Sequence, residues 1–222
     1  MVQPHNTQDE VVIGPETLSN ETSRRAFLGT LMAGAAAATT LAAAPASVFA
    51  STGKLKHVGA GIPTGDAAIL NFALTLEHLE ANFYVTAARS FPGSSYLSQL
   101  IRVLRFDEQA HVNGLTAALK GAGFTPVGPA PMYHLPKVFG NRKAFLDFAA
   151  TLENTGVHAY LGQAPNIKTP SILLTAASIA TVEARHTGAV RALLQRNPTD
   201  GAFDKGLTKA QVLAVAGPLI GQ

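Results

Sequence analysis

Two glutamate–histidine pairs recur in this sequence at a spacing that can bind metal. Glu108-Gln-Ala-His111 lies within RFDEQAHVN, and Glu183-Ala-Arg-His186 lies 75 residues later within TVEARHTGA. A glutamate and a histidine three residues apart point from the same helical face, so both can reach one ion or two adjacent ions. A single pair is a weak signal, because glutamates on amphipathic helices are ordinarily solvated. The second pair is what makes a metal site worth testing.

A longer repeat surrounds these pairs. LNFALTLEHLEANFY, residues 70–84, and LDFAATLENTGVHAY, residues 146–160, are identical at seven of fifteen positions and lie 76 residues apart. Each copy places a glutamate two helical turns before a tyrosine on one face, as Glu77 and Tyr84 in the first and as Glu153 and Tyr160 in the second. The matching offsets predict two helix pairs related by an approximate two-fold.

Together these motifs supply four carboxylates and two imidazoles, which is the ligand set of dinuclear iron and manganese carboxylate bundles. Oxygen ligands suit either metal, and their negative charge offsets that of the cations. The chain has no cysteine, which excludes thiolate sites. Only five glutamates follow residue 50, and four of them occupy the repeat positions. We therefore predict a site for two Fe or two Mn ions, and its ligands are Glu77, Glu108, His111, Glu153, Glu183 and His186.

Three further residues lie close to the predicted ligands. Glu80 has no counterpart in the second copy, where Gly156 stands, so it either supports the site or faces solvent. Tyr84 and Tyr160 either hydrogen-bond a ligand carboxylate or pack in the core. Asp107 flanks Glu108 but points about 100° away from it on the helix, so of two roles, orienting a histidine or forming a surface or interface pair, we favour the pair.

The elements that must position these residues are helices. Apolar residues at spacings of three and four predict helices over 65–90, 95–121, 142–163 and 170–196, with a short terminal helix near 208–219. The Pro- and Gly-rich segment 121–141 is too long for a tight turn, and a crossover of this length makes the second and third helices parallel. We therefore predict an all-α four-helix bundle with a long crossover between helices two and three.

Composition and charge favour one domain, over residues 65–222, without a nucleic-acid function. The chain has 222 residues, of which 47% are hydrophobic and 14% charged, enough for a sizeable core. Past residue 50 there are 15 Lys and Arg against 10 Asp and Glu, a net charge of about +5. These cations are scattered, with no dense run and no aromatic interleaving, so we expect no nucleic-acid partner.

Residues 1–50 resemble a twin-arginine export signal. Arg24 and Arg25 stand in SRRAFL, and an uncharged, Ala-rich stretch from Gly29 to Ala50 follows. Pro45 and the small-residue ending VFA favour cleavage over a stable membrane anchor. We expect the twin-arginine export machinery as a partner, a periplasmic or extracellular location, and a linker over residues 51–64.

Over residues 65–196 the sequence resembles the ferritin-like superfamily. The segments LNFALTLEHLEANFY and TLENTGVHAYLG more narrowly resemble the ferritin-like domain of plant desiccation-related proteins and their bacterial relatives. The resemblance implies a ferritin-like bundle with Glu77, Glu108 and His111 in one half-site and their counterparts in the other. It leaves three functions open. They are an oxidoreductase acting on O2 or peroxide, a non-enzymatic stress or desiccation-protection protein, and, third, iron storage in a homo-oligomer.

Overall fold

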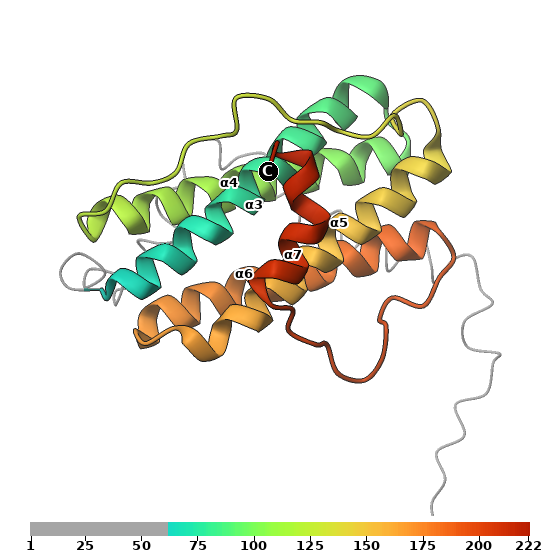
Figure 1. The fold of residues 1–222 in the computed structure, drawn as a ribbon. Helices are drawn as coiled ribbons and strands as arrows, with labels where there is room; N and C mark the ends of the chain where they lie inside the picture. Colours follow the sequence, from blue (N-terminus) through green and yellow to red (C-terminus); the bar gives the residue numbers. More distant parts are fainter. Residues whose placement is uncertain (1–61) are drawn as a thin grey trace, which may run out of the picture. The chain divides into compact units, whose positions relative to one another are not determined.

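The structure, a computed structural model, describes residues 62–222, which form a helical bundle (Figure 1). The predicted leader over residues 1–50 and most of the predicted linker over residues 51–64 lie outside the described residues. No helix within residues 62–222 combines the length and the hydropathy that a membrane crossing requires.

Four long helices and one short helix carry the described part of the chain, and the predicted all-α class is confirmed. The long helices are α3 (Thr64–Ser90), α4 (Tyr96–Gly121), α5 (Arg142–Gln163) and α6 (Pro170–Leu193). The short helix is α7 (Lys209–Ala216), and single 3-10 turns follow α5 at Ala164–Asn166 and α7 at Gly217–Leu219. The predicted boundaries agree with most of these ends within a residue or two.

Local chemistry explains why the helices begin where they do. The Ser95 hydroxyl accepts a 3.1 Å hydrogen bond from the backbone N–H of Ser98 at the start of α4. The Asn141 side chain accepts a 3.0 Å bond from Ala144 at the start of α5, and Pro170 opens α6, where its missing N–H costs nothing.

The end of α6 differs from the prediction. The helix ends at Leu193 rather than at residue 196, because Gln195 adopts a left-handed backbone with φ of 57°. The N–H groups of Gln195 and Arg196 donate 3.0 Å bonds back to the carbonyls of Ala192 and Arg191, which is the Schellman pattern of helix termination. Glycine usually marks this position, and a glutamine there provides no sequence signal.

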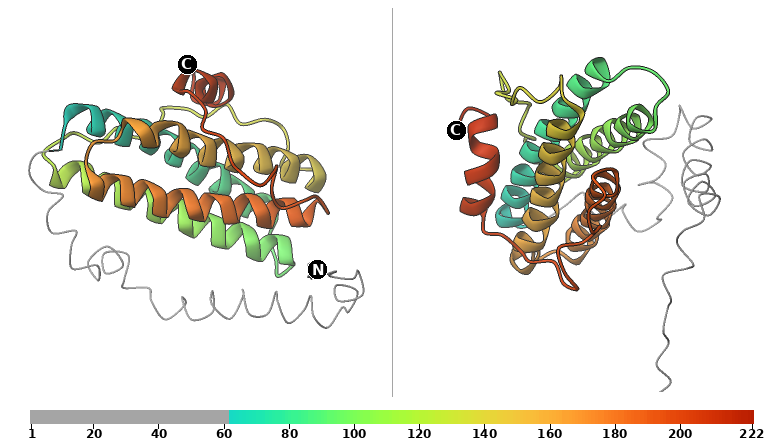
Figure 2. Two further views of the ribbon diagram at one scale, coloured as in Figure 1. Left: turned by 90° about the horizontal axis from the view of Figure 1, so that it is seen from below. Right: turned by 90° about the vertical axis from the view of Figure 1, so that its right-hand side faces the viewer.

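The crossover over residues 122–141 runs the length of the bundle, so α4 and α5 point in the same direction and α3 and α5 run antiparallel (Figure 1). Helix α3 packs closely on α4, and α5 on α6. Figure 2 shows α7 against the α3–α5 side of the bundle, with α4 and α6 on the opposite side. This is the topology predicted from the length of the second connection.

Two apolar clusters occupy the two ends of the bundle. One contains Phe83, Leu104 and Phe145 among others, and the second contains Leu74, Leu115 and Ile172. The repeated glutamates and histidines are buried among residues of both clusters. The four-helix arrangement therefore places these polar residues in the interior of the bundle.

The start of α3 is tied to the start of α6 by a buried aspartate. The Asp66 carboxylate accepts 2.9 and 2.8 Å hydrogen bonds from the backbone N–H groups of Lys168 and Thr169, just before α6. These bonds fix how far α6 is shifted along α3, and with it the level at which the residues of α6 meet those of α3.

Candidate metal centre

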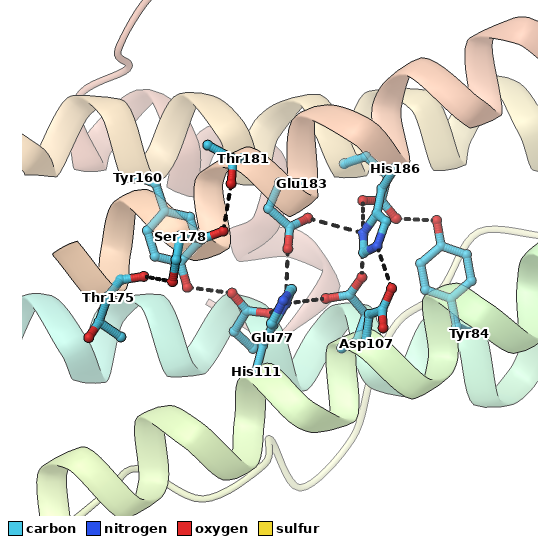
Figure 3. Close-up of polar contacts among 12 residues, drawn as sticks. Glu77, Tyr84, Asp107, His111, Tyr160, Thr175, Ser178, Thr181, Glu183 and His186 are labelled. Carbon is cyan, nitrogen blue, oxygen red and sulfur yellow. Dashed lines mark hydrogen bonds and ion pairs between the residues drawn. The ribbon is translucent and has the colours of Figure 1, made fainter. Parts of the chain in front are cut away.

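All six predicted ligands converge at the middle of the bundle. The four glutamates are 0–1% exposed, and His111 and His186 are 8% and 5% exposed. Each helix contributes: α3 and α5 provide one glutamate each, and α4 and α6 provide a glutamate–histidine pair each (Figure 3). A surface role for these glutamates is excluded by their burial.

The first group of ligand atoms surrounds His111. Its Nδ1 atom lies 3.2 Å from Glu77 Oε2, 3.2 Å from Glu108 Oε2 and 3.0 Å from Glu183 Oε1. Three carboxylates from three different helices thus face one ring nitrogen. One ligand atom from each of these four residues lies within 4.8 Å of all the others, which is close enough to surround a single ion.

The second group surrounds His186. Its Nδ1 atom lies 3.0 Å from Glu108 Oε1, 3.2 Å from Glu153 Oε2 and 3.7 Å from Glu183 Oε2. The arrangement mirrors the first group, as the sequence repeat predicts. Glu153 of α5 takes the place that Glu77 of α3 has beside His111.

Glu108 and Glu183 belong to both groups. Each turns one carboxylate oxygen toward His111 and the other toward His186. The two predicted half-sites are both present, but they are incomplete, because each of these two glutamates also faces the histidine of the other helix. A carboxylate with its two oxygens in different groups can bridge two ions, whereas Glu77 and Glu153 each face one position.

Unpaired polar atoms show that the residues fit a bound metal. Glu108 Oε1, Glu153 Oε2, both carboxylate oxygens of Glu183 and Nδ1 of His186 are buried without a hydrogen-bond partner. Such atoms are rare in folded proteins, and here ion pairs with the two imidazoles compensate their burial only in part. Cations placed among them would satisfy all of them at once, and the mixture of oxygen and imidazole donors suits Fe and Mn.

The electrostatics of the metal-free site indicate that protons occupy it. Burial, reinforced by Glu183, raises the pKa of Glu108 well above its usual range, and burial raises the pKa of Glu153 to about 7. For Glu183 burial is outweighed by the two imidazoles, which lower its pKa to about 2. Burial would lower the pKa of both histidines, but the surrounding carboxylates raise it. Metal binding must therefore displace protons.

The two tyrosines hydrogen-bond ligand carboxylates, each from the opposite copy of the repeat. Tyr84 of α3 donates to Glu153 Oε1, and Tyr160 of α5 donates to Glu77 Oε1 at 2.5 Å (Figure 3). The crossing follows from the antiparallel α3 and α5, because a residue two turns, roughly 10 Å, after its own glutamate comes level with the glutamate of the other helix. The hydrogen-bonding role is thus confirmed, and each phenol orients the oxygen that does not face a histidine.

Glu80 is a fifth buried carboxylate at the centre, only 2% exposed. A Cβ atom added at Gly156 would lie 3.2 Å from Glu80 Oε1 and 3.5 Å from Glu183 Oε2, so this glycine leaves room for both side chains. Burial, followed by the charges of Glu183 and Glu108, raises the pKa of Glu80 well above its usual range. Of the two predicted alternatives, the solvent-facing one is wrong.

Replacing Glu80 by glutamine should stabilise the metal-free protein at pH 8 and leave its stability at pH 4 unchanged. The amide resembles the protonated carboxyl in shape but cannot ionise among four other carboxylates, so the repulsion that grows with pH is removed. Urea unfolding of the chelator-treated protein at both pH values measures this. Asp204→Asn, at an exposed position, is the matched control, and equal effects of the two variants would contradict the role given to Glu80.

Asp107 contacts His186, which agrees with the less favoured of its two predicted roles. Its Oδ2 atom lies 3.1 Å from His186 Nε2, on the far side of the ring from the ligand carboxylates (Figure 3). The expected surface or interface pair is therefore wrong. Asp107 does point away from Glu108 on α4, but that direction leads to α6, and only the packing of the two helices shows it.

Comparison with known proteins agrees with the geometry. Residues 65–196 match a protein-family profile that is described as "Ferritin-like domain". The chain is also similar to the desiccation-related protein PCC13-62 of Craterostigma plantagineum, with 24% identity over 197 residues that cover 70% of this chain and 61% of that protein. The chain thus spans less than two thirds of this relative's length. The matched residues include every side chain of the central cluster, and the chain belongs to the ferritin-like domain family.

Proposed function

We propose that this protein is an exported oxidoreductase that holds two Fe or two Mn ions and acts on O2 or peroxide. The observation that carries the proposal is the paired arrangement of four carboxylates and two imidazoles, with Glu108 and Glu183 turned toward both histidines. Two ions so close together would, when bound, exchange electrons with a substrate by changing oxidation state.

The residues of this chain prepare that chemistry. Tyr84 and Tyr160 hold the outer oxygens of Glu153 and Glu77, so that the inner oxygens keep their orientation. Hydrogen bonds of this kind to ligand groups typically contribute about tenfold to a hundredfold in affinity or activity. The surrounding residues of both apolar clusters exclude bulk water from the charged site, which strengthens electrostatic interactions inside it.

Burial favours a small substrate. The four glutamates are at most 1% exposed and the more exposed histidine only 8%, so a large organic molecule would have to open the bundle to reach them. O2 and hydrogen peroxide are small enough to enter through side-chain fluctuations. Peroxide disproportionation needs no further reductant, because two peroxide molecules give two water molecules and one O2.

Protein recovered from the periplasm or the culture medium should contain Fe or Mn and evolve O2 from peroxide. Elemental analysis and an oxygen electrode measure the two properties, and the fractionation that yields the sample tests export in the same experiment. Glu108→Gln should lose metal and activity together, while His158→Ala, a partly buried histidine on α5 outside the cluster, should keep both. A metal-loaded protein inert toward both O2 and peroxide would overturn the oxidoreductase proposal.

Protection against drying is the second candidate function, and the printed name of the desiccation-related relative is what favours it. In that case the metal would serve to stabilise the bundle. Glu108→Ala combined with His111→Ala separates the two proposals. Survival of a protective effect in cells that carry this metal-free variant would support protection, whereas loss of protection together with metal would support the enzyme.

Export by the twin-arginine machinery stays part of the proposal, supported by SRRAFL and the uncharged segment that follows it. This route carries folded proteins, which suits a chain whose metal centre forms only when four helices have come together.

A further inference from the structure

The two copies of the internal repeat differ at the residue just before each Glu-x-x-His motif. The 75-residue offset that relates Glu108 to Glu183 and His111 to His186 relates Asp107 to Val182. His186 therefore has a carboxylate beside its outer nitrogen, at 3.1 Å, whereas the equivalent position on α6 carries an aliphatic side chain. The two imidazoles, alike in their inner surroundings, differ in their outer ones.

The aspartate fixes the orientation of the His186 ring. With Nε2–H donating to Asp107 Oδ2, Nδ1 faces Glu108, Glu153 and Glu183. A metal binds at Nδ1, so the ring is held in the binding orientation before the ion arrives. The anionic partner also makes the imidazole a stronger donor.

His111 lacks this support. Within residues 62–222, its hydrogen bonds and ion pairs all involve Nδ1, which faces Glu77, Glu108 and Glu183. The His111 ring is therefore oriented from its inner side alone, and fixing it on metal binding costs more free energy than at His186.

The ligand carboxylates and their tyrosine partners are the same in kind at the two positions. Both share Glu108 and Glu183, and each has one further glutamate held by a tyrosine from the opposite repeat. Glu80 feels Glu183 and Glu108 most strongly, which are the two shared carboxylates. Asp107 thus acts directly on the histidine of one position, whereas Glu80, the other break in the repeat, interacts most strongly with the two shared carboxylates.

We propose that Asp107 is a positioning residue that makes the metal position beside His186 the tighter one, so that the two ions bind in order. This inference rests on the metal site of the proposed function and adds the sequence of filling. The asymmetry leaves one ion firmly held while the second, beside His111, exchanges more readily with solution.

Titration of the metal-free full chain with Mn²⁺ tests this. Calorimetry should resolve two steps whose dissociation constants differ by about tenfold to a hundredfold. Asp107→Asn should weaken the tighter step by a similar factor and bring the two steps together. EPR spectra give a second readout, because at one ion per chain the native protein should show isolated Mn²⁺, whereas the variant should already show spin-coupled pairs.

Asp147→Asn is the matched control, since Asp147 and Asp107 are 33% and 31% exposed and Asp147 pairs with Lys143 and Arg196 away from the centre. Val182→Asp tests the converse and should strengthen the weaker step, which keeps the inference testable even if Asp107→Asn folds poorly. Two indistinguishable steps in the native protein, or unchanged steps in Asp107→Asn, would overturn the ordering and leave the metal site standing. Absence of Mn²⁺ and Fe²⁺ binding would instead overturn the proposed function.

Discussion

Glu183→Gln should cost the protein both of its metal ions, whereas Glu77→Gln should cost it only one. Glu183 Oε1 lies 3.0 Å from His111 Nδ1, and its Oε2 lies 3.7 Å from His186 Nδ1, so each oxygen serves a different position. Glu77 reaches His111 alone, at 3.2 Å. An amide keeps the size of the side chain but removes the charge and one oxygen donor, and a removed bridge weakens both positions together.

Four variants form a matched set, because the repeat supplies a partner for each. Glu108→Gln should behave like Glu183→Gln, and Glu153→Gln like Glu77→Gln, with the surviving ion now beside His111. Elemental analysis of protein reconstituted with excess Mn²⁺ and then desalted gives the number of ions per chain, and circular dichroism verifies that each variant is folded. Equal losses from all four variants would show that the two shared glutamates do not bridge.

The helices could be predicted from the sequence because their signals are local. The spacing of apolar residues predicted the four long helices. The Pro- and Gly-rich segment before Asn141 predicted the crossover, and with it the parallel direction of α4 and α5. The end of α6 could not be predicted in this way, since the helix ends at Leu193 and not at residue 196. Gln195 takes a left-handed conformation that glycine would normally announce, so nothing in the residue types indicated the stop.

The clustering of the six candidate ligands could be predicted because helical periodicity determines which residues share a face, but the contacts among these side chains could not. Whether Tyr84 meets Glu77 or Glu153 depends on how far one helix is shifted along the next, and so does the reach of Glu108 and Glu183 toward both histidines. The choice between the two predicted roles of Asp107 failed for the same reason, since its direction away from Glu108 leads to His186 of the neighbouring helix.

Without metal, the protein should lose stability as the pH rises from weakly acidic to alkaline values. Glu153 has a pKa of about 7 against an ordinary value of 4.5, and the pKa values of Glu80 and Glu108 are also raised. The folded state therefore binds protons more tightly than the unfolded state. This contribution is complete below pH 4.5 and disappears as the pH passes the folded-state pKa values. For Glu153 alone the loss is on the order of 3 kcal/mol.

The two histidines and Glu183 also contribute to the pH dependence of stability. The raised pKa values of His111 and His186 give stability that is complete below pH 6.5 and declines as the pH rises toward those values, in the same direction as the three glutamates. Glu183, with its pKa lowered to about 2, acts oppositely, since its contribution is present above pH 4.5 and lost as the pH falls toward 2. The metal-free protein should therefore be most stable near pH 4 to 5.

Added Mn²⁺ or Fe²⁺ should reverse this dependence, because each ion replaces protons and neutralises the carboxylates that repel one another at high pH. An ion at a thousand times its dissociation constant stabilises the folded state by about 4 kcal/mol, so two ions should raise the melting temperature at pH 8 by on the order of 20 °C. At pH 5 the shift should be much smaller, since bound protons compete. Thermal melting with and without metal across this range measures the effect. Mg²⁺, which prefers oxygen ligands alone, should give little shift, and a shift with Mn²⁺ that is independent of pH would contradict proton displacement.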